Sequence, residues 1–202
     1  MAKVTIQTVD AQPMEWTKQA AVVVGASLLV ALCAHVTVPL PGTPVPLSLV
    51  NFGVLVVALL LGSRRGFAAL ALYLVEGASG LPVFTPSILH GGIAQILGPT
   101  GGYLMAYPFV AFAAGWTYEH TSRRFGWAVL SGVAGEILLF IGGLTWLAAL
   151  THSVSTAIKY GLYWFVFAEI IKILMAAGVA SRWNQRFSES REPRAESLKP
   201  RL

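Results

Sequence analysis

Long uncharged, apolar stretches dominate the chain and set its class. Residues 19–63 contain no Asp, Glu, Lys or Arg over 45 positions, and residues 77–118 contain none over 42. A helix needs about 20 consecutive apolar residues to cross the hydrocarbon core of a bilayer. Because a soluble fold needs a charged exterior, these stretches predict an all-α integral membrane protein and exclude an ordinary soluble enzyme or a nucleic-acid binder.

Charged and turn-forming residues divide the apolar sequence into six segments. We expect helices at residues 17–36, 47–62, 66–77, 101–118, 127–150 and 157–181. The third segment is too short to cross a bilayer alone, so we expect either a half-length helix enclosed by its neighbours or an interfacial helix. The resulting division is a cytoplasmic segment at 1–16, a six-helix membrane domain at 17–181, and a basic, disordered cytoplasmic tail at 182–202.

The positions of the basic residues predict the orientation of the chain. With the N-terminus inside and six crossings, 12 of the 14 Lys and Arg residues fall on the inner side. The exceptions are Lys159, at the start of the sixth segment, and Lys172 within it. Since Lys and Arg concentrate in cytoplasmic loops, both termini are expected in the cytoplasm. The net charge of +5 then reflects topology and attraction to membrane lipid, with no role in binding nucleic acid.

Two outer loops have an unusual composition for segments that face water. Residues 38–47 read VPLPGTPVPL, and residues 78–100 are uncharged and rich in Gly and Pro. Each proline fixes φ and removes a hydrogen-bond donor, so the first loop should be stiff and extended. Two stiff, apolar loops on one face predict a structured cap over a cavity. The alternative is a pair of tight connectors that dip into the lipid headgroups.

Ionisable side chains inside the membrane are costly and usually mark function. Glu169 and Lys172 lie three residues apart, so they share one face of the sixth helix. They could offer one acceptor and one donor to a polar ligand at the bottom of a cavity, or form a purely structural ion pair. For Glu136, in the fifth segment, we favour a structural role as a hydrogen-bonding partner of a neighbouring helix, with a position on the cavity wall as the alternative.

The sequence offers no pattern for a metal, a cofactor or ATP hydrolysis. His35, His90 and His152 fall at outer ends or in loops, without metal-site spacing or nearby carboxylates in sequence. The single cysteine, Cys33, cannot form an internal disulfide, and there is no G-x-x-x-x-G-K-[ST] phosphate-binding loop. We therefore expect no metal, no cofactor and no catalytic residues.

Small residues recur at four-residue spacing in the first segment. Ala21 pairs with Gly25, and Ser27 pairs with Ala31. Such pairs allow two helices to approach closely. They predict either internal packing or a surface for another membrane subunit, and the sequence leaves both open.

Four motifs together resemble the BioY family. They are PLPGTPVP at 39–46, LLLGSRRG at 59–66, GLPVF at 80–84 and LGPTGGY at 97–103. BioY proteins are the biotin-specific S components, or substrate-binding subunits, of energy-coupling factor (ECF) transporters. The resemblance covers about residues 15–180. It implies a six-helix S-component fold in the bacterial plasma membrane, biotin captured at the outer face, and no enzymatic activity. It also implies two kinds of partner, an ECF transmembrane coupling subunit and a pair of ABC-type ATPases.

The same resemblance implies roles for individual residues. Glu169 would accept from a ureido N–H of biotin, and Lys172 would donate to the ureido carbonyl or, with the ligand reversed, pair with its carboxylate. Tyr103 would pack on the ligand or donate its hydroxyl, and Gly101 and Gly102 would permit close backbone approach.

The chain departs from the family pattern at two places. Thr85 or Ser87 would replace an amide side chain after the third motif. Val50 stands where a Gln is common, next to Asn51, which we include in the expected site. Ala21 and Gly25 are the expected docking face.

Three other interpretations remain open from the sequence. The chain could be an S component for riboflavin or thiamine. It could be an intramembrane enzyme that uses Glu136 or Glu169 as acid or base, although no nucleophile or metal set accompanies them. It could also be a structural or assembly protein without a ligand.

Overall fold

The computed structural model of the chain describes residues 13–86 and 91–189. These residues form eight helices and one two-stranded antiparallel hairpin. In chain order the elements are α1 Pro13–His35, β1 Thr37–Val38, β2 Leu47–Ser48, α2 Val50–Leu61, α3 Ser63–Ala78, α4 Ile93–Leu97, α5 Gly101–Glu119, α6 Phe125–Thr151, α7 Val154–Gly161 and α8 Val166–Glu189.

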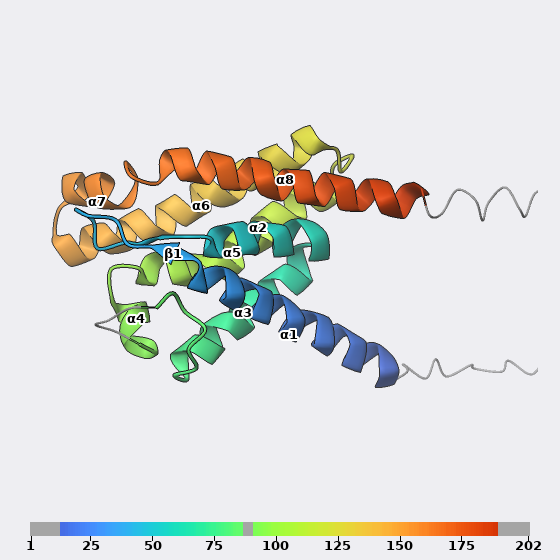
Figure 1. Cartoon of the computed structure of the whole chain (residues 1–202), viewed down its shortest axis with the longest axis horizontal. Coiled ribbons are helices and arrows are strands. Elements are labelled where there is room, and N and C mark those ends of the chain that lie inside the picture. The colour runs from blue at the N-terminus through green and yellow to red at the C-terminus, as the bar shows by residue number, and fades with distance from the viewer. Residues whose placement is uncertain (1–12, 87–90, 190–202) are drawn as a thin grey trace, which may run out of the picture.

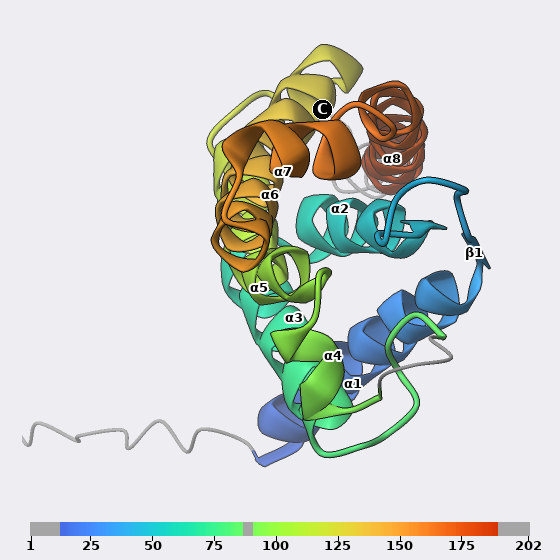
Figure 2. The same cartoon turned by 90° about the vertical axis from the view of Figure 1, so that its left-hand side faces the viewer.

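Helix α2 is the centre of the bundle. Figure 2 shows it with α1, α3, α5, α6 and α8 arranged around it. Its sequence, VNFGVLVVALLL, is apolar on every side, and nine of its 12 residues are buried. A helix that is apolar all round can be enclosed by other helices, because it has no polar face that needs contact with water. The N-terminal end of this central helix therefore presents its one amide side chain, Asn51, to the interior of the protein.

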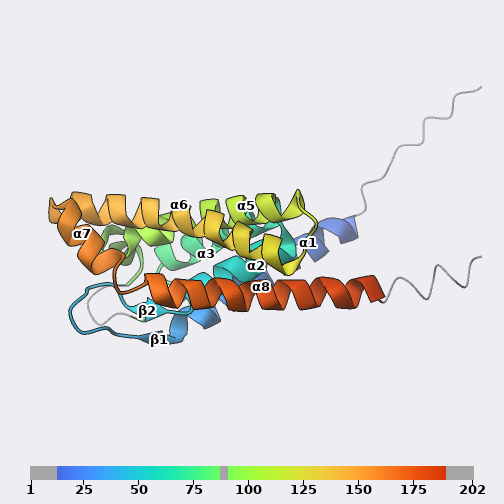
Figure 3. The ribbon, with the colours of Figure 1, turned by 90° about the horizontal axis from the view of Figure 1, so that it is seen from above.

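The two ends of the bundle differ in construction. The described chain starts and finishes at the same end, where the turns after α2 and α5 also lie (Figures 1 and 3). The hairpin, α4 and α7 gather at the opposite end. The basic residues next to the turns after α2 and α5 are thus separated from the hairpin by the length of the bundle.

The exterior of the bundle is apolar, as expected for a protein that contacts lipid. Large side chains such as Leu32 and Phe167 are 70% and 77% exposed. Trp16–His35 and Phe125–Thr151 are long and apolar enough to cross a bilayer, and α7 with α8 form a third span if this pair, bent by 50°, is counted as one. The chain is therefore an all-helical protein with apolar helices of membrane-spanning length.

The expected sixth helix is two helices. Four residues, 162–165, separate α7 from α8. Helix α8 then continues to Glu189, beyond the expected end at residue 181 and into the segment expected to be a disordered tail. Hydropathy marks where apolar surroundings end, whereas a helix can continue through polar residues with good helix propensity such as Arg182 and Arg186.

The expected second and third helices also have different starting points. Leu47 and Ser48 pair with Val38 and Thr37 as strands, so α2 begins three residues later than expected and the proline-rich loop is a hairpin. Helix α3 begins earlier than expected, at Ser63.

A contact from α5 stabilises that early start of α3. The Ser63 backbone N–H donates to Glu119 Oε1 at 3.1 Å, and the Ser63 hydroxyl donates to Oε2 at 2.7 Å. These bonds satisfy an otherwise free donor at the helix start. The two residues are 56 positions apart, which no local pattern could indicate.

The structure separates the two small-residue pairs of α1. Ser27 and Ala31 are buried inside the bundle, so they serve internal packing. Ala21 and Gly25 are exposed, and a Cβ added to Gly25 would meet no described atom within 4 Å. The first pair therefore remains open to the surroundings of the bundle.

Candidate ligand-binding site

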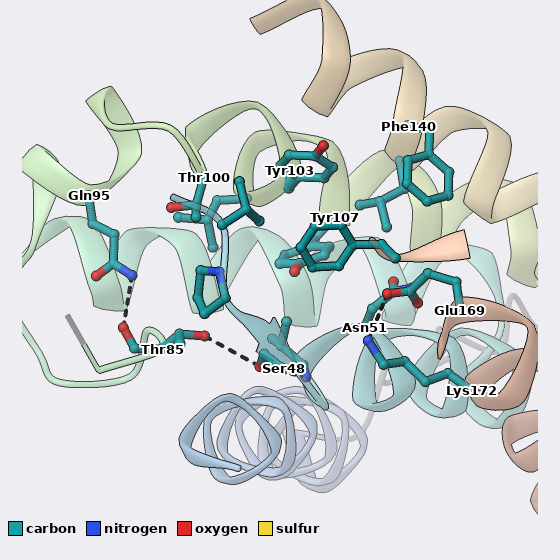
Figure 4. Close-up of a pocket in the computed structure, with 16 residues that line it drawn as sticks. Ser48, Asn51, Thr85, Gln95, Thr100, Tyr103, Tyr107, Phe140, Glu169 and Lys172 are labelled. Atoms are coloured by element: carbon teal, nitrogen blue, oxygen red, sulfur yellow. Dashed lines mark hydrogen bonds and ion pairs between the residues drawn. The ribbon is translucent and has the colours of Figure 1, made fainter. Parts of the chain in front are cut away.

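A pocket lies where the hairpin, the N-terminal end of α2, and helices α5 and α8 meet (Figure 4). Its empty volume is about 590 Å³, counted out to its open side. It combines apolar walls with a few polar groups, as small-molecule sites do. The lining residues are Val45, Pro46, Ser48, Val50, Asn51, Thr85, Gln95, Thr100, Tyr103, Leu104, Tyr107, Leu139, Phe140, Phe165, Glu169 and Lys172.

Both of the unusual outer loops contribute to the pocket wall. The first supplies Val45 and Pro46, and Ser48 follows it directly in β2. The second supplies Thr85, whose hydroxyl donates to the Ser48 hydroxyl at 3.4 Å. Gln95, on α4, donates its Nε2 to the Thr85 carbonyl at 2.9 Å. The two loops are thus joined to each other at the pocket. Ser87, the other residue expected here, lies outside the described residues.

The charged part of the pocket is an ion pair on α8. Lys172 Nζ donates to Glu169 Oε1 at 2.7 Å, and the two residues are only 5% and 6% exposed. The second oxygen of the same carboxylate, Oε2, accepts from Asn51 Nδ2 of α2 at 2.7 Å. Pairing and hydrogen bonding offset the cost of removing these charges from water. The sequence prediction that Glu169 and Lys172 share one face agrees with this geometry.

Glu136 of α6 belongs to the same hydrogen-bonded cluster but lies outside the pocket. Asn51 Nδ2 also donates to Glu136 Oε1, so the amide lies between two carboxylates. Glu136 is buried but does not line the pocket. The hydrogen bond to α2 matches the structural interpretation of Glu136. Two acceptors of the cluster, Asn51 Oδ1 and Glu136 Oε2, have no hydrogen-bond partner among the described residues.

Tyrosines from α5 form an aromatic part of the wall. Tyr103 lines the pocket, and its hydroxyl donates to the Gly161 carbonyl of α7 at 2.9 Å. The hydroxyl is therefore engaged within the protein, which leaves the ring as the part available to a ligand. Tyr107 follows one helical turn later on the same face and also lines the pocket.

Gly101 and Gly102 serve packing and do not line the pocket. A Cβ on Gly102 would lie 2.3 Å from Trp146 Cβ on α6, and a Cβ on Gly101 would lie 1.7 Å from the Ile96 carbonyl oxygen of α4. Their small size thus lets α5 approach the protein's own backbone and side chains. The expectation that they make room beside a ligand is not met in this geometry.

Some lining residues were not anticipated from the sequence. Tyr107 could have been found, because it lies four residues after Tyr103 on a predicted helix. Gln95 is the one polar side chain of IAQIL within an uncharged loop, which is a weaker signal. Ser48 carried no signal, since its position depends on the pairing of the hairpin strands.

The chain is similar to known proteins in sequence and in fold. The BioY family matches residues 3–189. A protein of Thermotoga maritima named biotin transporter BioY is 38% identical over 154 residues, which cover 76% of this chain and 88% of the relative. Biotin transporter BioY2 of Lactococcus lactis subsp. cremoris is 34% identical over 155 residues, covering 76% and 82%. A crystal structure of the S-component for biotin from an ECF-type ABC transporter superposes with a TM-score of 0.76 at 24% identity, covering 86% of this chain and 94% of that one.

The buried ion pair leads to a prediction about stability. In the single variant Glu169→Gln the Lys172 ammonium loses its anionic partner. We therefore expect the free energy of unfolding to fall by about 3–5 kcal/mol. The double variant Glu169→Gln with Lys172→Met removes both charges and should recover most of that loss. Thermal unfolding in detergent without ligand measures both variants. A single variant that unfolds at the wild-type temperature would contradict this account.

Proposed function

Because the chain belongs to the BioY family, we propose that it is the substrate-binding subunit of a biotin uptake transporter and has no enzymatic activity. The observation that carries the proposal is the pocket that places Asn51, Glu169 and Lys172 together among apolar side chains. The names of the relatives give the ligand, since they are called biotin transporters.

The chemistry of biotin suits this pocket. Biotin has an apolar ring and chain, a ureido group with donors and an acceptor, and a carboxylate. We propose that Glu169 accepts from a ureido N–H and that Lys172 donates to the ureido carbonyl. With the ligand reversed, Lys172 would pair with the carboxylate. Leu139, Phe140 and Phe165 supply apolar wall for the remainder of the molecule.

We further propose that the chain crosses the bacterial plasma membrane six times, with both termini in the cytoplasm. The crossings would be α1, α2, α3, α5, α6, and the bent pair α7 and α8. Arg64 and Arg65 stand in the first turn of α3, and Arg123 and Arg124 directly precede α6. These positions fit the preference of basic residues for the cytoplasmic side. Biotin would then enter at the opposite face, under the hairpin and α4.

The energy for transport would come from partner proteins. The sequence has no phosphate-binding loop of its own, and the solved S-component belongs to an ECF-type ABC transporter. We propose an ECF transmembrane coupling subunit and a pair of ABC-type ATPases as partners. The exposed pair Ala21 and Gly25 on α1 is the proposed docking face, because small side chains permit close helix approach.

Biotin binding by the isolated chain tests the function. The chain is purified in detergent from biotin-depleted cells and titrated with biotin, riboflavin and thiamine in a calorimeter. We expect one-to-one binding of biotin alone. Lys172→Ala should weaken binding by about two orders of magnitude, because it removes a charged donor and leaves Glu169 unpaired. The control is Arg64→Ala, whose exposed side chain lies far from the pocket and which should bind as wild type does. Binding of riboflavin or thiamine in place of biotin would overturn the proposed ligand.

Reporter fusions test the orientation. Alkaline phosphatase is active only outside the cytoplasm, and green fluorescent protein exported in unfolded form fluoresces only inside. A fusion after the last residue should therefore fluoresce and show no phosphatase activity, whereas phosphatase inserted after Gly42 in the hairpin loop should be active. The reverse pattern would refute the proposed topology.

Copurification tests the docking face. Gly25→Leu adds bulk to an exposed position of α1, so it should reduce recovery of co-expressed coupling subunit by about tenfold while biotin binding stays unchanged. Gly178→Leu on α8 is the matched control, because a Cβ on Gly178 also meets no described atom within 4 Å. Equal recovery with both variants would remove Gly25 from the interface.

A further inference from the structure

The amide of Asn51 is held by carboxylates from two different helices. Its Nδ2 donates to Glu136 Oε1 of α6 and to Glu169 Oε2 of α8, the latter at 2.7 Å. Asn51 is 2% exposed and Glu136 is 5% exposed, so both hydrogen bonds lie in the interior of the bundle. Three helices that are distant in sequence therefore meet at one side-chain amide.

The chemistry of the three groups fixes the orientation of that amide. An amide nitrogen carries two hydrogens, and each of them can serve one carboxylate. While both acids are ionised, a reversed amide would place its oxygen against acceptor atoms of Glu136 and Glu169, and neither contact would then contain a hydrogen. Glu136 and Glu169 together thus select one orientation, in which Nδ2 faces them and Oδ1 does not. With Glu136 removed, one of the two groups that select this orientation is lost.

The cluster contains acceptor atoms that no described residue pairs. Asn51 Oδ1 has no hydrogen-bond partner among the described residues, and a buried unpaired acceptor lowers stability. Asn51 nevertheless lines the pocket, whereas Glu136 does not. An unpaired acceptor on a pocket-lining side chain is suited to a ligand that brings an N–H group.

Asn51 also bears on the ion pair. One oxygen of Glu169 accepts from Asn51 and the other from Lys172. A well-placed amide therefore fixes the rotation of the Glu169 carboxylate and, with it, the direction in which the Lys172 ammonium is held. A displaced amide would release one side of this carboxylate.

We propose that Glu136 is a positioning residue for ligand binding: through Asn51 it sets the amide and the Glu169 carboxylate in the arrangement that receives the ureido group. This role rests on the proposed function, because it assumes that biotin occupies the pocket. Glu136 itself does not touch the ligand in this arrangement.

Two substitutions at Glu136 test this role by calorimetric titration with biotin. Glu136→Gln keeps an acceptor for Asn51 and should bind within about threefold of wild type, whereas Glu136→Leu removes the acceptor at similar size and should bind at least about tenfold more weakly. Ser131→Ala is the matched control, since Ser131 is buried on the same helix outside the pocket and should leave affinity unchanged. If Glu136→Leu is not recovered folded, Glu136→Ala takes its place with the same expectation.

A double-mutant cycle separates positioning from a general effect on the fold. In an Asn51→Ala background, adding Glu136→Leu should change the biotin dissociation constant by less than about twofold, because the group through which Glu136 acts is already absent. If the two substitutions instead weaken biotin binding by factors that multiply in full, Glu136 acts independently of Asn51 and the proposed role is wrong. A folded Glu136→Leu variant with wild-type affinity would also overturn it. If the wild-type chain does not bind biotin, the proposed function fails and this role fails with it. If the wild-type chain binds biotin and Glu136→Leu binds it equally well, only the role of Glu136 fails.

Discussion

The cost of burying charge inside a membrane protein governs the arrangement of this bundle. Glu169 and Lys172 are tolerable there only because they pair with each other and because the remaining carboxylate oxygen accepts from Asn51. That requirement places the start of α2 against α8, and the second bond of Asn51 places it against Glu136 of α6. The polar cluster thus fixes how these three helices meet. The ligand pocket forms beside this junction.

Two loop segments close to this cluster form further parts of the pocket wall. The hairpin and the segment before α4 are joined by Thr85 and Ser48, and both border the pocket. The prolines of the hairpin loop fix φ and remove backbone donors, so this segment needs fewer polar contacts than a water-exposed loop usually makes. The pocket is therefore lined by the Glu169–Lys172 ion pair, by aromatic and aliphatic side chains, and by residues of both loops. The basic residues that follow α2 and α5, at the other end of the bundle, do not line the pocket.

Much of this could be predicted from the sequence, for identifiable reasons. Uncharged stretches of more than 40 residues indicate membrane helices, and the spacing of Glu169 and Lys172 places them on one face whatever the rest of the fold does. The resemblance to the BioY family, carried by four motifs, is confirmed by the family match. The contacts that were missed all join distant parts of the chain. The cap of α3 by Glu119, the bond from Asn51 to Glu136 and the packing of Gly102 on Trp146 depend on which helices are neighbours, and local patterns do not carry that information.

The central claim is that the pocket between the hairpin, α2 and α8 holds biotin, and an experimental structure of the chain bound to biotin tests it most directly. The account predicts ligand density in contact with Asn51, Glu169 and Lys172, enclosed by the hairpin and Thr85. Biotin bound elsewhere, with these three side chains in contact only with other side chains of the protein, would contradict it.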